Sequence, residues 1–310
     1  MTWLVWRQHR AQVAWAAGAL AVFAAAIAIT GVHMADLYGA AVRDDGSAGP
    51  RLLDHLFDGY GAIIDTVHLT LLLPVVLGAF VAAPLIAREA DLATDALVWT
   101  QSVTRRRWLA AKLAAVVGGC VALAAGVSAL VTWWSGTPNA LGGDRFHGAQ
   151  FDTQNLTPVA FTLFAVALGL AAGAALRRTL PAVVATVVGY VAVRMAVGIF
   201  VRPHWLAPLH RTGGAGPDAR LRSGSWLVKS DLLDPSGHAV GVRLAVPRSC
   251  ARVSAQAIDG CMTRAGFRTV ITYHPPGHYW PMQLAESGLF VALAAGLLAF
   301  AVVRTLRAEP

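Results

Sequence analysis

Six apolar stretches, each long enough to cross a lipid bilayer, constrain the fold of this chain more than any other feature. A helix needs about 20 mainly apolar residues to span the hydrocarbon core, because in lipid its backbone polar groups must bond within the segment. We therefore predict membrane-spanning helices at about 13–32, 68–87, 108–133, 158–176, 181–201 and 284–303. Of the 310 residues, 56% are hydrophobic and only 14% are charged, so we expect an all-α integral membrane protein with one transmembrane domain, residues 1–310.

The arginines near the ends of these stretches indicate how the chain is oriented. Short loops rich in Lys and Arg stay on the cytoplasmic side of a membrane. By this rule both termini are cytoplasmic, and a large extracellular loop, 202–283, separates the fifth and sixth spans. The inner side holds Arg7, Arg10, Arg88, Arg105, Arg106, Arg107, Lys112, Arg177, Arg178, Arg304 and Arg307, against Arg43, Arg51 and Arg145 in short outer loops. The large loop also carries ten basic residues, but loops longer than about 60 residues translocate largely regardless of charge.

Two segments predict short helices outside the lipid core. The segment 2–10 has Trp3 and Trp6 about one helical turn apart with basic residues behind them, which is typical of an N-terminal interfacial helix. The cytoplasmic loop between the second and third spans has apolar side chains at helical spacing, namely Leu92, Ala96, Trp99 and Val103. This pattern favours a short helix across the inner ends of the two spans. A solvated connector that only carries orientation arginines is an equal alternative.

The chain lacks the motifs of several catalytic classes. It has no G-x-x-x-x-G-K-[ST], since neither Lys112 nor Lys229 follows a glycine, and so it does not hydrolyse nucleotide by that route. H-E-x-x-H, C-x-x-C and G-x-S-x-G are also absent. The net charge of +8 is spread over span ends and one loop without interleaved aromatics, which argues against nucleic acid and favours contact with anionic lipid.

Four histidines of the large loop have spacings that could hold a metal, and they are His204, His210, His274 and His278. Pro275 and Pro276 lie between the last two and argue against the helical i, i+4 presentation that this spacing needs. We therefore expect solvated loop histidines and no metal site.

Two ionisable residues and two cysteines are further candidates. Arg194 lies inside the fifth span, where an arginine must pair, snorkel or face a water-filled cavity. Glu286 begins the sixth span and is a candidate partner, so the two form either a structural ion pair or part of a substrate path. Cys250 and Cys261 lie in a loop that we expect outside, where a disulfide is allowed, and both a bridge and two free thiols stay open.

Three segments resemble the membrane subunits of bacterial ABC-type exporters, a permease family with six spans per chain. The stretch from Ala83 to Leu113, A-P-L-I-A-R-E…T-D-A-L-V-W-T-Q-S-V-T-R-R-R-W-L-A-A-K-L, looks like the first cytoplasmic loop of that family. The stretch from Tyr273 to Glu286, Y-H-P-P-G-H-Y-W-P-M-Q-L-A-E, is similar to the Y-x-P…F-W-x-F-Q…E run before its last span. The opening M-T-W-L-V-W-R-Q-H-R also resembles the start of the family.

This resemblance implies a transport mechanism. A separate ABC ATPase would bind ATP and Mg and dock under the cytoplasmic loop, while this chain would be a transporter subunit without catalytic residues or a cofactor of its own. The coupling residues would be Arg88, Glu89, Thr94, Trp99, Thr100, Gln101, Ser102 and Arg105. Two membrane subunits, either two copies of the chain or the chain and a sibling, would enclose an export path in the bacterial cell membrane. The apolar second and fifth spans favour an apolar or amphipathic cargo.

Two other functions stay open, a membrane-embedded enzyme and a peptide-sensing or immunity protein, each acting through the large loop. No nucleophile with a matched base stands out in residues 202–283, which leaves the enzyme with little support. An ABC ATPase gene beside this one would favour the transporter.

Overall fold

A computed structural model describes the chain over residues 2–43, 59, 63, 65–91, 105–140, 145–146, 148–214, 224–240, 246–247, 249–250, 254 and 257–307. Over these residues six helices are long and apolar enough to cross a membrane, which is the number that the sequence predicts. They are Leu20–Ala40, Asp65–Arg88, Leu109–Trp134, Thr157–Leu176, Thr179–His204 and Pro276–Arg307. The chain divides into two compact units. The helical unit is Met1–Leu141, Asp152–Tyr190 and Ser287–Pro310, and the mixed unit is Gly142–Phe151 and Val191–Glu286.

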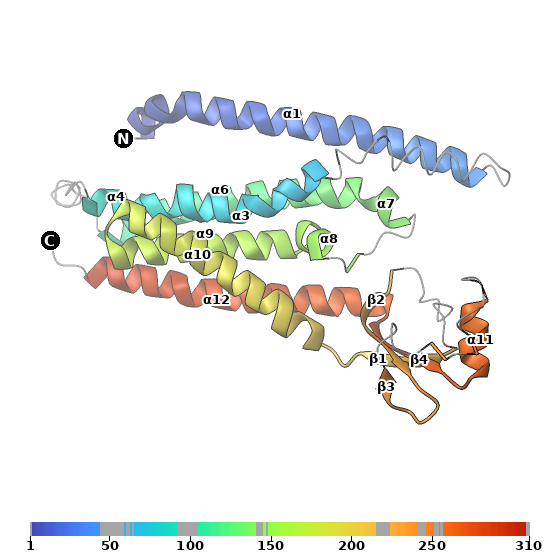
Figure 1. Ribbon diagram of the computed structural model, residues 1–310. Coiled ribbons are helices and arrows are strands. Elements are labelled where there is room, and N and C mark those ends of the chain that lie inside the picture. Colours follow the sequence, from blue (N-terminus) through green and yellow to red (C-terminus); the bar gives the residue numbers. More distant parts are fainter. Residues whose placement is uncertain are drawn as a thin grey trace. The chain divides into compact units, whose positions relative to one another are not determined.

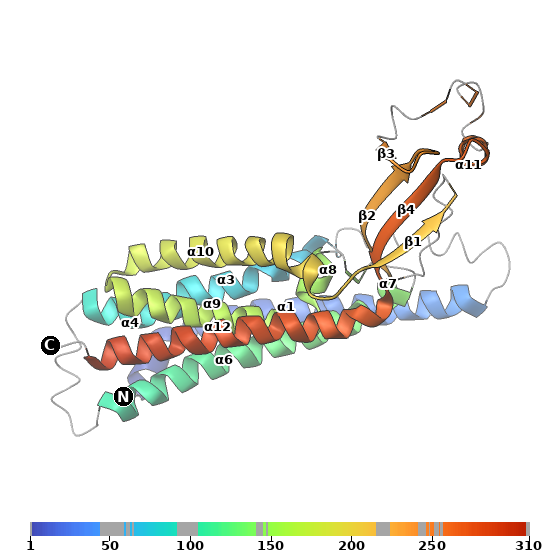
Figure 2. The ribbon, with the colours of Figure 1, turned by 90° about the horizontal axis from the view of Figure 1, so that it is seen from below.

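The helical unit is built around α9, Thr157–Leu176 (Figure 1). In α9, 67% of the most apolar stretch is buried, against 28% or less in the other five candidate spans. It packs against α3 (Leu73–Val76), η2 (Leu77–Ala82), α4 (Ala83–Asp91) and α6 (Arg105–Trp134). Figure 2 also shows α12 (Tyr279–Arg307) beside it, where Phe290 meets the rings of Phe161 and Phe164. A helix enclosed in this way is apolar on all sides, as the α9 sequence is.

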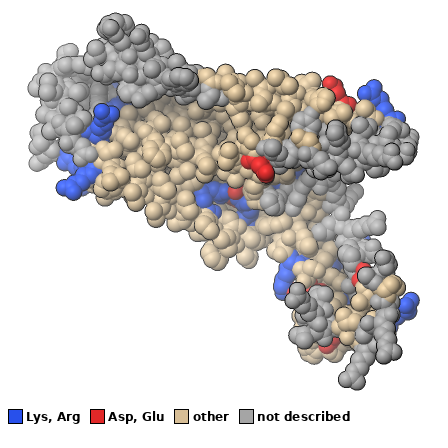
Figure 3. All heavy atoms as spheres, turned by 45° about the horizontal axis from the view of Figure 1, so that its top comes forward, with Lys and Arg blue, Asp and Glu red and all other residues tan. Residues whose placement is uncertain are grey.

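The outer surface of the helical unit is also apolar. On α10 (Thr179–Ala196), Leu180, Val184 and Val188 follow one another at a spacing of one helical turn, and all three are exposed. On the face shown in Figure 3, a wide area over the helices carries no Lys, Arg, Asp or Glu. Apolar surface of this extent is suited to lipid or to another membrane chain.

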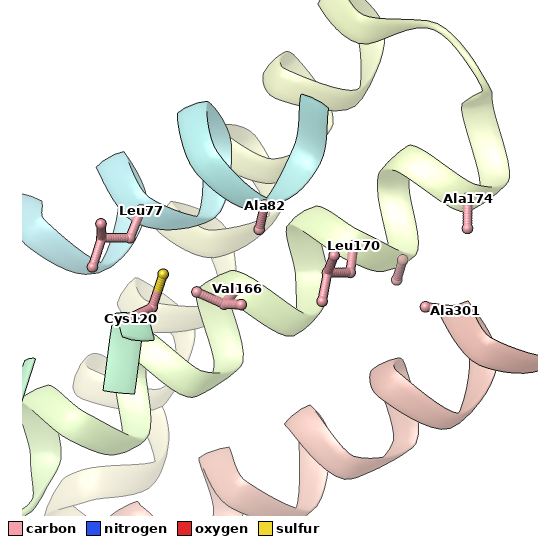
Figure 4. Packing of buried hydrophobic residues seen from close by; sticks show 8 residues of the cluster. Leu77, Ala82, Cys120, Val166, Leu170, Ala174 and Ala301 are labelled. Atoms are coloured by element: carbon pink, nitrogen blue, oxygen red, sulfur yellow. The ribbon is translucent and has the colours of Figure 1, made fainter. Parts of the chain in front are cut away.

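Close packing between α9 and the second span depends on two glycines. A Cβ on Gly169 would overlap the carbonyl oxygen of Gly78, and a Cβ on Gly78 would overlap that of Ala165. The two backbones therefore touch directly, as small residues allow between membrane helices. Larger side chains fill the flanks in a cluster shown in Figure 4, which contains Leu77, Ala82, Cys120, Val166, Leu170, Ala171, Ala174 and Ala301.

The second span changes its helix type along its length, from the 3₁₀ turn η1 (Leu69–Leu72) through α3 and the π turn η2 to α4. The π turn is closed by a hydrogen bond from the Ala83 N–H to the Gly78 carbonyl. Pro84 follows at once and has no N–H to donate to the Phe80 carbonyl, as an α-helix would require. The proline thus accounts for the wider turn, which is a recognised way to relieve a break in the helical ladder.

The first helix, α1, spans Thr2–Arg43 and therefore continues past the predicted end of the first span at residue 32. Residues 34–43, which we expected in an outer loop, are helical. Its contact with α6 includes a hydrogen bond from Trp134 Nε1 to Thr30 Oγ1 of 3.2 Å. The side chains of residues 2–17 lie outside the described residues, so the interfacial helix stays a prediction.

Short connections join the remaining elements of the helical unit. α9 ends where Arg177 takes a left-handed conformation (φ 53°) and donates its N–H to the Gly173 carbonyl at 3.1 Å. α10 begins two residues later at Thr179, so the turn at 177–178 is as tight as the sequence predicts. The short helices α7 (Gly136–Ala140) and α8 (Gly148–Thr153) follow α6 in the chain.

The mixed unit contains a β-sheet, and the expectation of an all-α fold is wrong in this respect. Its described strands are antiparallel in the order β1-β4-β2-β3, with β1 Leu209–Gly213, β2 Trp226–Leu233, β3 Ala239–Val240 and β4 Arg268–His274. The central strand β4 reads R-T-V-I-T-Y-H, which is rich in the β-branched and aromatic residues that favour strands. A short helix, α11 (Ile258–Arg264), precedes it. The sequence predicts only a large loop over residues 202–283.

A turn built on Asp234 connects β2 to β3. Asp234 Oδ1 accepts hydrogen bonds from the N–H groups of Ser236 and His238, each at 2.9 Å, and from the Ser236 hydroxyl at 2.6 Å. The Ser236 hydroxyl and then these backbone bonds lower the pKa of the Asp234 carboxyl. Gly237 supplies the left-handed conformation (φ 88°) that lets the chain turn back.

Candidate functional site

Glu286 is fully buried in the mixed unit and is held by two arginines. Arg202 contacts both carboxylate oxygens, with Nε 2.8 Å from Oε2 and Nη2 2.7 Å from Oε1. Arg194 Nη1 lies 3.1 Å from Oε1. The Arg202 side chain is 6% exposed and that of Arg194 is 13% exposed. Because the bidentate contact is shorter and more deeply buried, Arg202 is the main partner of Glu286.

A π turn in the fifth span places the two arginines on one face. In an uninterrupted α-helix their directions would differ by about 80°, since each of the eight steps advances about 100°. The turn η3 (Val197–Val201) lies between them and is closed by the Arg202 N–H on the Val197 carbonyl. A turn with i to i+5 bonds advances less per residue and so reduces this difference. Pro203 accounts for the turn, because it has no N–H for the Ile199 carbonyl.

The aromatic ring of Phe151 packs against the ion pair of Arg202 and Glu286. The Arg202 guanidinium lies 4.4 Å from the centre of the Phe151 ring, within reach of a cation–π contact. Gln283, one turn before Glu286 on α12, donates to the Phe151 carbonyl at 3.0 Å and to the Tyr279 hydroxyl at 3.2 Å. Phe151 and Tyr279 belong to a buried cluster that also contains Phe146 and Met282, with Trp205, Leu206 and Trp226 at its edge. Burial of the ion pair strengthens the electrostatic contact, and the Phe151 ring fixes the orientation of the guanidinium.

The structure thus brings together the predicted pair, Arg194 and Glu286, and adds a third residue that sequence analysis missed. In the sequence prediction Arg202 is one of the basic residues of the large loop, whereas it is buried at the C-terminal end of the fifth candidate span. The signal that could have found it is Pro203, which marks a change of helix register next to a basic residue. Chemically, the three residues can hold the end of the fifth span to the start of the last one. If the two arginines bound other partners in place of Glu286, the two spans would be released from each other.

The predicted coupling residues are only partly described. Arg88 is exposed near the end of α4, and Glu89 belongs to the backbone of the same helix. Arg105 begins α6, but its side chain, like that of Glu89, is outside the described residues. The remaining five, Thr94, Trp99, Thr100, Gln101 and Ser102, also lie outside the described residues.

The two helices on either side of this loop are firmly attached to the helical unit. Lys112 Nζ on α6 donates to the Leu85 carbonyl on α4 at 3.1 Å, which joins the two helices near the points where they enter the loop. Ala83 and Ala87 of α4 are fully buried against Ala182 of α10. These contacts fix α4 to α6 and to α10.

The cysteines and histidines of the mixed unit also meet. Cys250 and Cys261 form a disulfide, next to Leu232 and Met262 in a small core. His274 is buried, so the expectation that it is solvated is wrong. Its Nδ1 lies 3.1 Å from Nδ1 of His278. Among the described residues, no group of three or more His, Cys, Asp or Glu side chains is placed to hold a metal.

The family of the chain follows from a comparison with protein-family models. The model described as ABC-2 membrane transporter related matches residues 17–202, which is more than half of the chain. The chain belongs to this family. The comparisons with curated proteins and with solved structures give no match. As an ABC-2-related membrane protein with six candidate spans, the chain is a multi-pass permease of the ABC transporter type.

Proposed function

We propose that this chain is the membrane-spanning subunit of an ABC exporter and that a separate ATPase subunit drives it. The observation that carries the proposal is the match of the ABC-2-related model to residues 17–202, which include the first four candidate spans, the loop between the second and third, and all but the last two residues of the fifth span. On this proposal the ATPase binds ATP and Mg, and this chain contributes the path across the membrane.

Energy enters through the loop between α4 and α6 in this proposal. The ATPase docks against Arg88, Glu89, Trp99 and neighbouring residues as far as Arg105, and its closure pushes the loop. The Lys112 to Leu85 hydrogen bond and the buried face of α4 support the idea, because they make the base of the loop rigid. The direct backbone contact between η2 and α9 then transmits the displacement from the second span to α9.

The assembled transporter contains two membrane subunits in a bacterial cell membrane, either two copies of this chain or this chain and a sibling. The exposed apolar side chains of α10 support a surface of this kind against lipid and a second subunit. Both termini face the cytoplasm, and the cargo is apolar or amphipathic and is carried outward.

Co-purification with the ABC ATPase encoded in the same genome tests the proposal. We expect the ATPase to remain bound to the wild-type chain in detergent, and Trp99→Ala and Glu89→Ala to lower its retention and the ATP hydrolysis of the complex at least tenfold. Trp280→Ala is the matched control, because Trp280 is exposed in the mixed unit and far from the loop in sequence. Full retention of the ATPase by both loop variants would refute the docking site, and no ATPase retained by the wild-type chain would refute the function.

A further inference from the structure

We propose that His274 and His278 form a binding site for a divalent transition-metal ion such as Zn²⁺, Cu²⁺ or Ni²⁺. The site lies where β4 ends and the 3₁₀ turn η5 (Pro276–His278) leads into α12. An ion held there would join the last residue of the central strand to the start of the last helix. The proposal rests on this pair alone and does not depend on the transport function.

The first argument is the distance between the two nitrogens. Nδ1 of His274 and Nδ1 of His278 are 3.1 Å apart. Imidazole nitrogens bind Zn²⁺ at about 2.0–2.1 Å, so one ion could contact both at an N–metal–N angle of about 95–100°. That angle falls between the square-planar and tetrahedral values, which suits Cu²⁺, Ni²⁺ and Zn²⁺. The segment between the histidines, which contains the two prolines, is not α-helical, but the extended end of β4 followed by a tight turn brings the same side chains together.

The second argument is the hydrogen bond on the far side of the His274 ring. Nε2 lies 3.3 Å from the Pro203 carbonyl oxygen, which can only accept, so Nε2 carries the proton. Nδ1 of the neutral ring then has its lone pair directed at His278. Histidines that bind metals almost always donate their other N–H to a carbonyl or carboxylate in this way, which fixes the tautomer and the ring plane.

The third argument is the surroundings of the pair. The His274 ring is fully buried and stacks on Trp226, with ring centres 5.3 Å apart. His278 is only half-buried, and it gives an ion access from solvent.

Metal binding at this pair leaves the number of protons on the two rings unchanged. In the neutral pair the proton between the two Nδ1 atoms belongs to His278, because His274 holds its own on Nε2. An ion takes the place of this proton, which moves through solvent to Nε2 of His278. Since no third protein ligand is placed nearby among the described residues, water completes the coordination, and the site is of the open kind.

Metal titration of the purified full chain, with any histidine tag removed, tests the proposal. We expect calorimetry with Zn²⁺ and Ni²⁺ at neutral pH to show one saturable site, and His278→Gln to weaken it at least tenfold. The matched control is His204→Gln, since His204 is exposed and its Nδ1 already contacts the Phe200 carbonyl of its own helix. Size-exclusion chromatography and circular dichroism check that each variant is folded.

A spectroscopic readout distinguishes this pair from scattered surface histidines. With one equivalent of Cu²⁺, electron paramagnetic resonance should show two imidazole nitrogens in the wild-type chain and in His204→Gln, and fewer in His278→Gln. Equal affinities in all three proteins, or an unchanged nitrogen pattern in His278→Gln, would overturn the site. Absence of saturable binding to the wild-type chain would overturn it as well.

Discussion

At the scale of single residues, Glu286 stands out because one carboxylate forms ion pairs with the guanidinium groups of two arginines. This carboxylate is fully buried. A buried ion pair adds little net stability compared with apolar residues, but removing one partner leaves an uncompensated charge that costs about 3–5 kcal/mol. The triad therefore acts chiefly as a constraint on which ends of the spans can meet.

Replacing Glu286 with Gln should lower the free energy of unfolding by about 3 kcal/mol, because both arginines lose the buried charge of this carboxylate. Arg202→Met should cost more than Arg194→Met, since Arg202 makes the bidentate contact. Unfolding in detergent with increasing denaturant measures these differences. Lys229→Gln, which breaks the exposed pair with Asp231, is the control and should cost less than about 1 kcal/mol. Equal stability of Glu286→Gln and wild type would show that the triad carries no such constraint.

At the scale of elements, two prolines determine how two spans are wound. Pro84 follows η2 and Pro203 follows η3, and in each case a π turn ends two residues before the proline. The reason is the same in both, since proline has no N–H for the carbonyl four residues earlier. In the fifth span this change of register is what allows Arg194 and Arg202 to reach the same carboxylate.

Pro203→Ala should restore an α-helical register and turn Arg202 away from Glu286. We expect Pro203→Ala to destabilise the chain and to make a further Arg202→Met change nearly neutral, because the contact is already lost. A double-mutant cycle on unfolding free energies measures this coupling. If the two changes are additive within about 0.5 kcal/mol, the π turn does not position Arg202.

Gly169→Ala should disrupt the contact between α9 and the second span, since its methyl group would overlap the Gly78 carbonyl. Overpacking of this kind costs about 1–3 kcal/mol, and here rigid backbone faces the added atom on the other side. Gly118→Ala on α6 is the control, because a Cβ there meets nothing within 4 Å. Thermal unfolding in detergent compares the two variants. A Gly169→Ala protein as stable as the control would mean that the two helices are less closely packed.

At the scale of the whole molecule, the proposed function requires that the loop between α4 and α6 and the β-sheet face opposite sides of the membrane. The distribution of Lys and Arg over the short loops supports this orientation. Exposed described positions are available in both regions, Arg106 at the start of α6 and Ser236 in the turn after β2.

In intact cells, a membrane-impermeant maleimide should label Ser236→Cys but not Arg106→Cys, and permeabilised cells should label both. Cys120 is buried and the other two cysteines are bridged, so the background is expected to be low. Labelling of Arg106→Cys in intact cells would reverse the orientation and exclude docking of a cytoplasmic ATPase on this loop.

The sequence by itself determined the number of spans, because about 20 consecutive apolar residues have few other uses than crossing a bilayer. It also determined the family resemblance and one side of the ion pair, since an arginine inside an apolar helix must find a partner. Span ends, the β-sheet, Arg202 as the main partner of Glu286 and the meeting of His274 with His278 were decided only by tertiary structure. The sheet and the burial of His274 depend on contacts between residues far apart in the chain, and the direction of Arg202 depends on a helix register that Pro203 shifts. The meeting of His274 with His278 depends on the turn after β4. None of these leaves a pattern of apolar residues in the sequence.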